Sequence, residues 1–273
     1  MIVQPAEHSG DAAFVILQND HTAFAGQLVR HFGNDRFAPL EPAELVTSLV
    51  EWHDEGWTDL DKRFLADPDT GLPYNLASTP MSELLPTAEL TPTLGEARHP
   101  FIGLLSSMHS CGLFNGRYGL EDAALSDKLP PPARKRVDAL LTAEGERQER
   151  LRAELLADST TAHLVDDTLV LRTYKALEFF DIFSLYMQCE HPSRHQETVM
   201  RHVPVDVEPA HDVTITVTPL GHGSYRVSPY PFDIEPFMPA TTGRYLSPQP
   251  SGTDLRALWS AADSAEQRVH LCA

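Results

Sequence analysis

The sequence predicts a mainly α-helical bundle with a small antiparallel β-sheet. Apolar residues recur at intervals of three and four through most of residues 20–190, which is the spacing of helices with one buried face. Residues 1–19 and 203–273 contain stretches that alternate apolar and polar side chains, as half-buried strands do. We therefore expect an N-terminal hairpin and C-terminal strands to form one sheet. All 273 residues should form a single domain, with 20–190 as its helical core and 203–273 as a β-rich extension.

The expected helices have recognisable ends. They begin near residues 20, 42, 100, 133 and 169, and a short helix follows at 254–262. Asp20 can cap the first helix, and Gly33 can stop it, because glycine readily adopts the left-handed conformation that ends many helices. Gly56 is expected to end the second helix in the same way. The helix at 133–157 is rich in Arg, Glu and Leu, which predicts a solvated face or, alternatively, a homodimer contact.

The segment between the second and third helices has a different composition. Residues 61–99 are dense in Pro, Thr, Asp and Gly, which favour turns over regular structure. The segment is too long to be a simple connector. We therefore expect a long ordered loop that wraps the mouth of a site.

The overall charge excludes some partners. The chain has 21 basic and 39 acidic residues, a formal net charge of −18, and so lacks the positive surface that binds nucleic acid or an anionic membrane. No apolar run reaches the ~18 residues of a membrane span, and the N-terminus lacks the pattern of a signal peptide. The three scattered cysteines favour reduced thiols over disulfides. We expect a cytoplasmic protein that acts on a small molecule.

Four of the expected helices place metal-binding types of side chain on their apolar faces. His53 follows Leu49 by four residues, and Asp54 is adjacent to it at the helix end. The other side chains of this kind are His21, His109 and Asp181. A single such histidine is more often a hydrogen-bonded core residue, and Asp181 could instead form a buried ion pair with His21. The whole set, however, predicts a metal site.

The donor types indicate the metal and its chemistry. Imidazole nitrogen with carboxylate oxygen and no thiolate suits a divalent transition metal, with Fe or Mn preferred and Zn, Co or Ni as alternatives. One or two ions are expected. Such an ion lowers the pKa of bound water toward ~7 and so yields a nucleophile at neutral pH. Glu55 and Glu178 can orient a ligand or act as the base. An anionic substrate needs cations, and the candidates are Lys62, Arg172 and Lys175.

The order His, His-Asp, His and a late Asp resembles the HD superfamily of metal-dependent phosphohydrolases and related oxygenases. That resemblance implies an HD-domain-like helical bundle, with His21, His53, Asp54 and Asp181 as metal ligands. It also implies that His109 matches a middle histidine that binds a second metal in dinuclear members. Dinuclear members usually have two middle histidines, and the candidates for the second, His99 and His163, lie outside the expected helix interiors.

The whole chain is also similar to the family called domain of unknown function 3891. The matching stretches are Met1–Val3, Asp20–His21, His53–Trp57, Leu104–His109, Asp181–Tyr186 and Tyr230–Phe232. This combined pattern is specific and covers nearly the full length, but the family name gives no reaction.

These resemblances imply a metal-dependent enzyme acting on a small molecule, by hydrolysis of a phosphate ester through a metal-bound hydroxide. One alternative is a non-haem iron or di-iron oxygenase of the inositol-oxygenase-like HD type. Another is a degenerate HD protein that binds a ligand without turnover. The HD resemblance supplies the reaction class by analogy only.

Overall fold

The computed structural model describes residues 1–8 and 10–273, and Ser9, in the turn between the two expected N-terminal strands, lies outside the described residues. The α-helices are α1 (Gln18–Arg30), α2 (Ala43–Trp52), α3 (Thr58–Asp61), α4 (Met81–Arg98), α5 (Pro100–Asn115), α6 (Pro131–Ala157), α7 (Asp167–Gln188) and α8 (Leu255–Ala261). The strands are β1 (Ile2–Gln4), β2 (Ala13–Ile16), β3 (Thr198–Val203), β4 (Val213–Gly221), β5 (Ser224–Ser228), β6 (Ala240–Leu246), β7 (Ser264–Arg268) and β8 (His270–Cys272).

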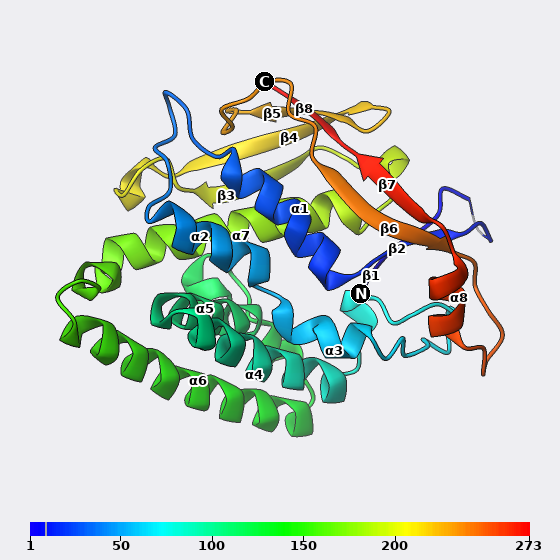
Figure 1. The fold of residues 1–273 in the computed structure, drawn as a ribbon, viewed down its shortest axis with the longest axis horizontal. Helices are drawn as coiled ribbons and strands as arrows, with labels where there is room; N and C mark the ends of the chain where they lie inside the picture. Colours follow the sequence, from blue (N-terminus) through cyan, green and yellow to red (C-terminus); the bar gives the residue numbers. More distant parts are fainter. Residues whose placement is uncertain (9) are drawn as a thin grey trace.

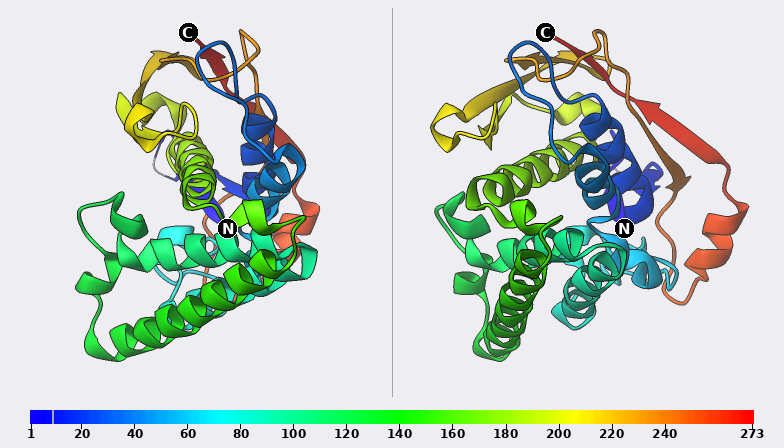
Figure 2. Two further views of the ribbon diagram at one scale, coloured as in Figure 1. Left: turned by 90° about the vertical axis from the view of Figure 1, so that its left-hand side faces the viewer. Right: turned by 60° about the vertical axis from the view of Figure 1, so that its left-hand side comes forward.

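Helices α1, α2 and α7 occupy the middle of the molecule (Figures 1 and 2). A sheet of β3, β4, β5 and β8 covers them on one side, and helices α4, α5 and α6 pack below them on the other. Helix α7 contacts α1, α2, α5 and β3, so it is buried along most of its length. Its apolar run includes Tyr174, Phe180 and Phe183, all fully buried, because a helix surrounded by other elements needs apolar residues on every side.

The prediction of a mainly α-helical bundle with one small antiparallel sheet is wrong. The chain forms two four-stranded sheets, in the orders β1-β2-β6-β7 and β3-β4-β5-β8. The N-terminal hairpin does pair with a C-terminal strand, since β2 runs antiparallel to β6. However, β8 leaves that sheet and pairs in parallel with β5. Alternation along the chain shows that a segment is a strand but does not identify its partner, which depends on contacts distant in sequence.

The positions of the main helices are confirmed, and the expected long loop at residues 61–99 is only partly correct. Its second half forms α4, although Pro86 and Pro92 lie inside that helix. Proline costs about 3 kcal/mol in a helix interior, so local preference alone opposes this helix. Packing of α4 against α5 outweighs that preference, with Leu85 and Ala88 buried in a cluster with residues of α5 and α6.

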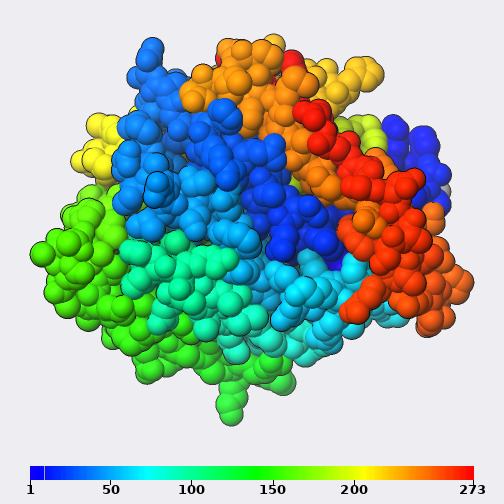
Figure 3. Space-filling model, in the orientation of Figure 1, coloured from blue at the N-terminus to red at the C-terminus, as the bar shows by residue number. Residues whose placement is uncertain are grey.

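Strand β6, strand β7 and helix α8 lie beside the N-terminal hairpin on one face, although the two termini themselves are well separated (Figure 1). In Figure 3 the C-terminal residues, in orange and red, lie against the N-terminal residues, in dark blue. The pairing of β2 with β6 and of β6 with β7 accounts for this contact. Within the described part of the chain, no helix is both long enough and apolar enough to span a membrane.

Candidate metal centre

Four helices bring five ligand-type side chains to one buried point. They are His21 on α1, His53 and Asp54 just after α2, His109 on α5 and Asp181 on α7. Asp181 Oδ1 lies 3.3 Å from His21 Nε2 and 3.6 Å from His53 Nε2. Asp54 Oδ2 lies 3.8 Å from His53 Nε2, and the rings of His53 and His109 are 5.2 Å apart between centroids. All five residues named from the sequence are therefore neighbours.

The separations of 3.3, 3.6 and 3.8 Å between these oxygen and nitrogen atoms fit donors around a metal ion. Ligands bound at about 2.1 Å lie about 3.0 Å apart when adjacent and about 4.2 Å apart when opposite. The possible ligand atoms form two overlapping groups, His21–His53–Asp54 and His53–His109–Asp181, and within each group all atoms lie within 4.8 Å of one another. Because His53 belongs to both groups, it is the centre of the cluster.

The position of His53 and Asp54 results from a sharp turn after α2. The helix ends at Trp52, and Asp54 (φ −116°, ψ 21°) leads into the short 3-10 helix η1 (Glu55–Trp57). The expectation that Gly56 ends the helix is wrong. Gly56 is instead buried against α4, where its backbone N–H donates to Thr91 Oγ1 at 3.1 Å. This packing fixes the turn that presents both ligand-type side chains.

Each of the three histidines has its Nδ1 atom held by an oxygen acceptor. His53 Nδ1 donates to the Val50 carbonyl at 2.7 Å, His21 Nδ1 to Gln188 Oε1 at 2.7 Å, and His109 Nδ1 to Glu178 Oε1 at 2.7 Å. A neutral imidazole that donates from Nδ1 keeps its lone pair on Nε2, which is the form that binds a metal. His53 Nε2 is buried and has no hydrogen-bond partner among the described residues. A buried polar atom of this kind is costly unless it binds something.

The carboxylates make this point attractive to positive charge. Burial alone would lower the pKa of His53, but the charges of Asp54 and Asp181, whose oxygens lie 3.8 and 3.6 Å from His53 Nε2, outweigh it and raise the pKa to about 9. Burial opposes ionisation of Asp181, yet His21 and His53 hold its pKa well below the usual value. Burial lowers the pKa of His109 to about 4, so that imidazole is neutral. The same field that favours a proton on His53 would favour a divalent cation there.

Glu178, on α7, accepts a hydrogen bond from His109 Nδ1. Orienting a ligand is one of the two roles that the sequence suggested for Glu178, the other being that of a base. The other oxygen of Glu178 accepts a hydrogen bond from Arg117, which also pairs with Glu121 at 2.9 Å. Arg117 lies in η3 (Arg117–Gly119), the turn directly after α5, and was not predicted. A carboxylate bound to the outer nitrogen of a histidine orients the ring and increases its basicity. The chain Arg117–Glu178–His109 has this arrangement.

Gln188 is a second supporting residue that the sequence analysis missed. Its Oε1 accepts from His21, and its Nε2 donates to Thr241 Oγ1 of β6 at 2.8 Å. Gln188 follows Asp181 by seven residues on α7, which is two helical turns along the same face. That spacing is a signal from which it could have been found. The bond to Thr241 holds the amide with its oxygen toward His21.

The substitution Gln188→Met should lower the affinity for a divalent metal about 10- to 100-fold, as loss of an outer partner of a ligand typically does. Methionine has a similar length but cannot accept from His21 Nδ1 as an amide oxygen does. Titration of the metal-free protein with Co²⁺ or Mn²⁺ measures this change. Gln188→Glu keeps the acceptor and should retain most of the affinity, and Gln196→Met, at an exposed glutamine after α7, is the matched control. Equal affinity in Gln188→Met and wild type would contradict the role given to Gln188.

The remaining predicted site residues lie in other surroundings. Glu55 pairs with Arg98 at 2.9 Å, and Lys62 is exposed and pairs with Asp59. Arg172 donates to the carbonyls of Ala38 and Pro39, which makes it a structural link between α7 and the loop after α1. Lys175 pairs with Asp212 at 2.5 Å and lines a cavity that Glu178 also lines. Of the three predicted cations, only Lys175 is therefore near the centre.

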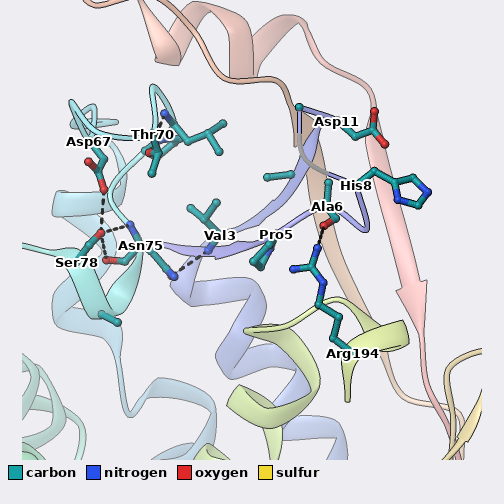
Figure 4. A pocket seen from close by; sticks show the side chains of 15 residues that line it. Val3, Pro5, Ala6, His8, Asp11, Asp67, Thr70, Asn75, Ser78 and Arg194 are labelled. Carbon is teal, nitrogen blue, oxygen red and sulfur yellow. Dashed lines mark hydrogen bonds between the residues drawn. The ribbon is translucent and has the colours of Figure 1, made fainter. Parts of the chain in front are cut away.

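A cavity of about 610 Å³ lies away from this centre, between the N-terminal hairpin and the segment 67–78 (Figure 4). On its walls, Ser78 donates to Asp67 and Arg194 donates to the carbonyl of Ala6. None of the five metal-ligand candidates is among its described lining residues. The cavity that Glu178 lines has about 510 Å³ and is adjacent to His109, because Glu178 accepts a hydrogen bond from that histidine.

Comparison with known proteins gives a family but no activity. No curated protein and no solved structure matches the chain significantly. One family, described as "Protein of unknown function (DUF3891)", matches residues 1–248, a range that includes all five candidate ligands as well as Gln188 and Glu178. The chain therefore belongs to the DUF3891 family, as its sequence motifs predicted.

Proposed function

We propose that this protein is a metal-dependent enzyme that hydrolyses a phosphate ester of a small molecule. The observation that supports this most is the unpartnered, fully buried Nε2 of His53 between two carboxylates. His21, His53, Asp54, His109 and Asp181 would hold the ion. Their nitrogen and oxygen donors suit Fe or Mn, with Zn, Co or Ni as alternatives. Such an ion supplies Lewis acidity and lowers the pKa of a coordinated water.

The chain's own residues have defined tasks in this proposal. Val50, Gln188 and Glu178 hold the three imidazoles in the form with a free Nε2 lone pair. The buried carboxylate of Asp181 would offset the positive charge of the ion. Helices α1, α5 and α7 exclude bulk water from the site, which strengthens each of these electrostatic interactions.

The order of the ligand types along the chain supports the reaction class. His21, then His53-Asp54, then His109, then Asp181 resembles the order in the HD superfamily of metal-dependent phosphohydrolases. This likeness concerns the motif and its convergence on one point, and the reaction class is taken from it by analogy.

A second candidate function is an iron oxygenase that uses two ions. The observation that favours it is that the five ligand-type residues form two overlapping groups, although His53, which belongs to both, could bind only one of two ions. Two neighbouring irons would suit activation of O₂ together with a substrate hydroxyl. The first candidate needs only one ion.

The two functions are separated by one set of measurements on the purified protein. Hydrolysis predicts phosphate release from at least one member of a phosphoester panel, loss of this activity with EDTA, and recovery when Mn²⁺, Fe²⁺ or Co²⁺ is added. The oxygenase predicts two irons per chain and O₂ consumption with a polyol substrate. If the protein binds no divalent metal after reconstitution, both the hydrolase and the oxygenase proposals are excluded.

A further inference from the structure

The cavity adjacent to Glu178 is built like a small-molecule site. It has a volume of about 510 Å³ and lies between η3, α7 and β3. Its apolar wall includes Phe179 and Ile182 of α7 and Met200 of β3. Its size and its mixture of apolar side chains with a few charged groups are typical of pockets for small ligands.

Its walls contain strained backbone. Arg117 (φ 51°) and His202 (φ 58°) both line the cavity in the left-handed conformation, which residues other than glycine rarely adopt. Tyr118 (φ 55°), next to Arg117, shares this conformation. The pairing of β3 with β4 is also irregular between Met200 and Val203, next to Arg201. Strain and strand irregularities of this kind concentrate at binding sites, where they redirect side chains.

The charges around the cavity point to the sign of its ligand. Arg117 is neutralised by Glu178 and Glu121, and Lys175 by Asp212. Asp122 also lines the cavity. Arg201 forms no ion pair within residues 1–8 and 10–273, although the chain has a net charge of −18. An uncommitted guanidinium beside an apolar wall suits an oxyanion, which it can bind through two parallel hydrogen bonds.

We propose that this cavity binds a small organic anion, with its oxyanion on Arg201 and its apolar part against Phe179 and Ile182. Arg117 and Lys175 also line the cavity, but both are already paired with acidic side chains, which leaves Arg201 as the group for the oxyanion. The five candidate metal ligands do not line the cavity in the described structure, so binding there does not require a bound metal. Glu178 nevertheless belongs to both places, because it lines the cavity and accepts from His109. The ligand would therefore lie directly beside the centre.

The test uses EDTA-treated, metal-free protein, so that its result does not depend on the proposed enzymatic activity. Phenyl phosphate is titrated as the organic anion. Inorganic phosphate probes the oxyanion site alone, and phenol probes the apolar wall alone. We expect phenyl phosphate to bind at least about 10-fold more tightly than either half, since both walls contribute. Arg201→Ala should weaken its binding about 10-fold, the loss expected for a charged hydrogen bond.

Arg226→Ala provides the matched control. Arg226 is an exposed arginine on β5 of the same sheet and is not among the described lining residues. It should leave the affinity unchanged, and amide NMR signals of residues 179–182 and 199–202 should shift as phenyl phosphate is added to the wild type. Equal losses in the two arginine variants would overturn the proposal. Phenol binding as tightly as phenyl phosphate, or no saturation by phenyl phosphate up to about 10 mM, would also overturn it.

Discussion

The substitution Asp181→Asn is expected to abolish stoichiometric metal binding. Asparagine preserves the size of the side chain and an acceptor oxygen, but it removes the negative charge. Asp181 Oδ1 lies 3.3 Å from His21 Nε2 and 3.6 Å from His53 Nε2. The loss of affinity should be larger than the about 10- to 100-fold loss typical of an outer partner, because we propose Asp181 as a direct ligand. Competition with a chelator of known affinity measures it.

Asp167→Asn is the control for this experiment. Asp167 is in the first turn of the same helix, and its side chain is 93% exposed. A saturating metal should raise the thermal stability of wild type and of Asp167→Asn, by about 2.7 kcal/mol at 100 times the dissociation constant. It should leave that of Asp181→Asn unchanged. If Asp181→Asn binds metal as tightly as wild type, Asp181 is not a ligand, and the buried ion pair with His21 becomes the better description.

The second large effect is expected from Gly56→Ala, which should destabilise the fold by about 2–3 kcal/mol. A Cβ atom at Gly56 would lie 2.4 Å from the carbonyl oxygen of Thr87 and 2.8 Å from the backbone nitrogen of Thr91. These are backbone atoms of α4 and cannot rotate away. The η1 segment must therefore move, and it takes the adjacent His53 and Asp54 with it.

Gly145→Ala is the matched control for Gly56→Ala. Gly145 is inside α6, and no atom lies within 4 Å of the position of its added Cβ. Alanine should stabilise this helix by up to about 1 kcal/mol, since glycine is a poor helix former. Urea denaturation of both variants gives the two free energies of unfolding. Opposite signs are expected, and a Gly56→Ala protein as stable as wild type would show that η1 is free to move from α4.

Helical periodicity was sufficient to find the buried histidines of the candidate metal centre because it is a local property. A residue that follows an apolar core residue by four positions lies on the same face wherever the helix packs. This rule placed His53 after Leu49 and His109 after Leu105, and both are buried at the centre. It would also have found Gln188, which follows Asp181 by seven.

Nearness in sequence was a poor guide to the cations. Arg172 precedes Asp181 by nine residues, which is about 14 Å along a helix and on its opposite face. Its side chain accordingly contacts the loop after α1. Arg117, which does reach Glu178, is distant from it in sequence and depends on the left-handed turn at Gly116.

The sequence by itself determined helices α1, α2, α5, α6 and α7, the family and the five side chains that meet, since each depends on local spacing or on motif identity. Tertiary structure alone decided the division of the strands into two sheets, the helical state of α4 and the support of His21 and His109 by Gln188 and Glu178. The physical reason is that strand partners, packing against a neighbouring helix and hydrogen bonds between elements are formed by residues far apart in the chain, which no local pattern specifies.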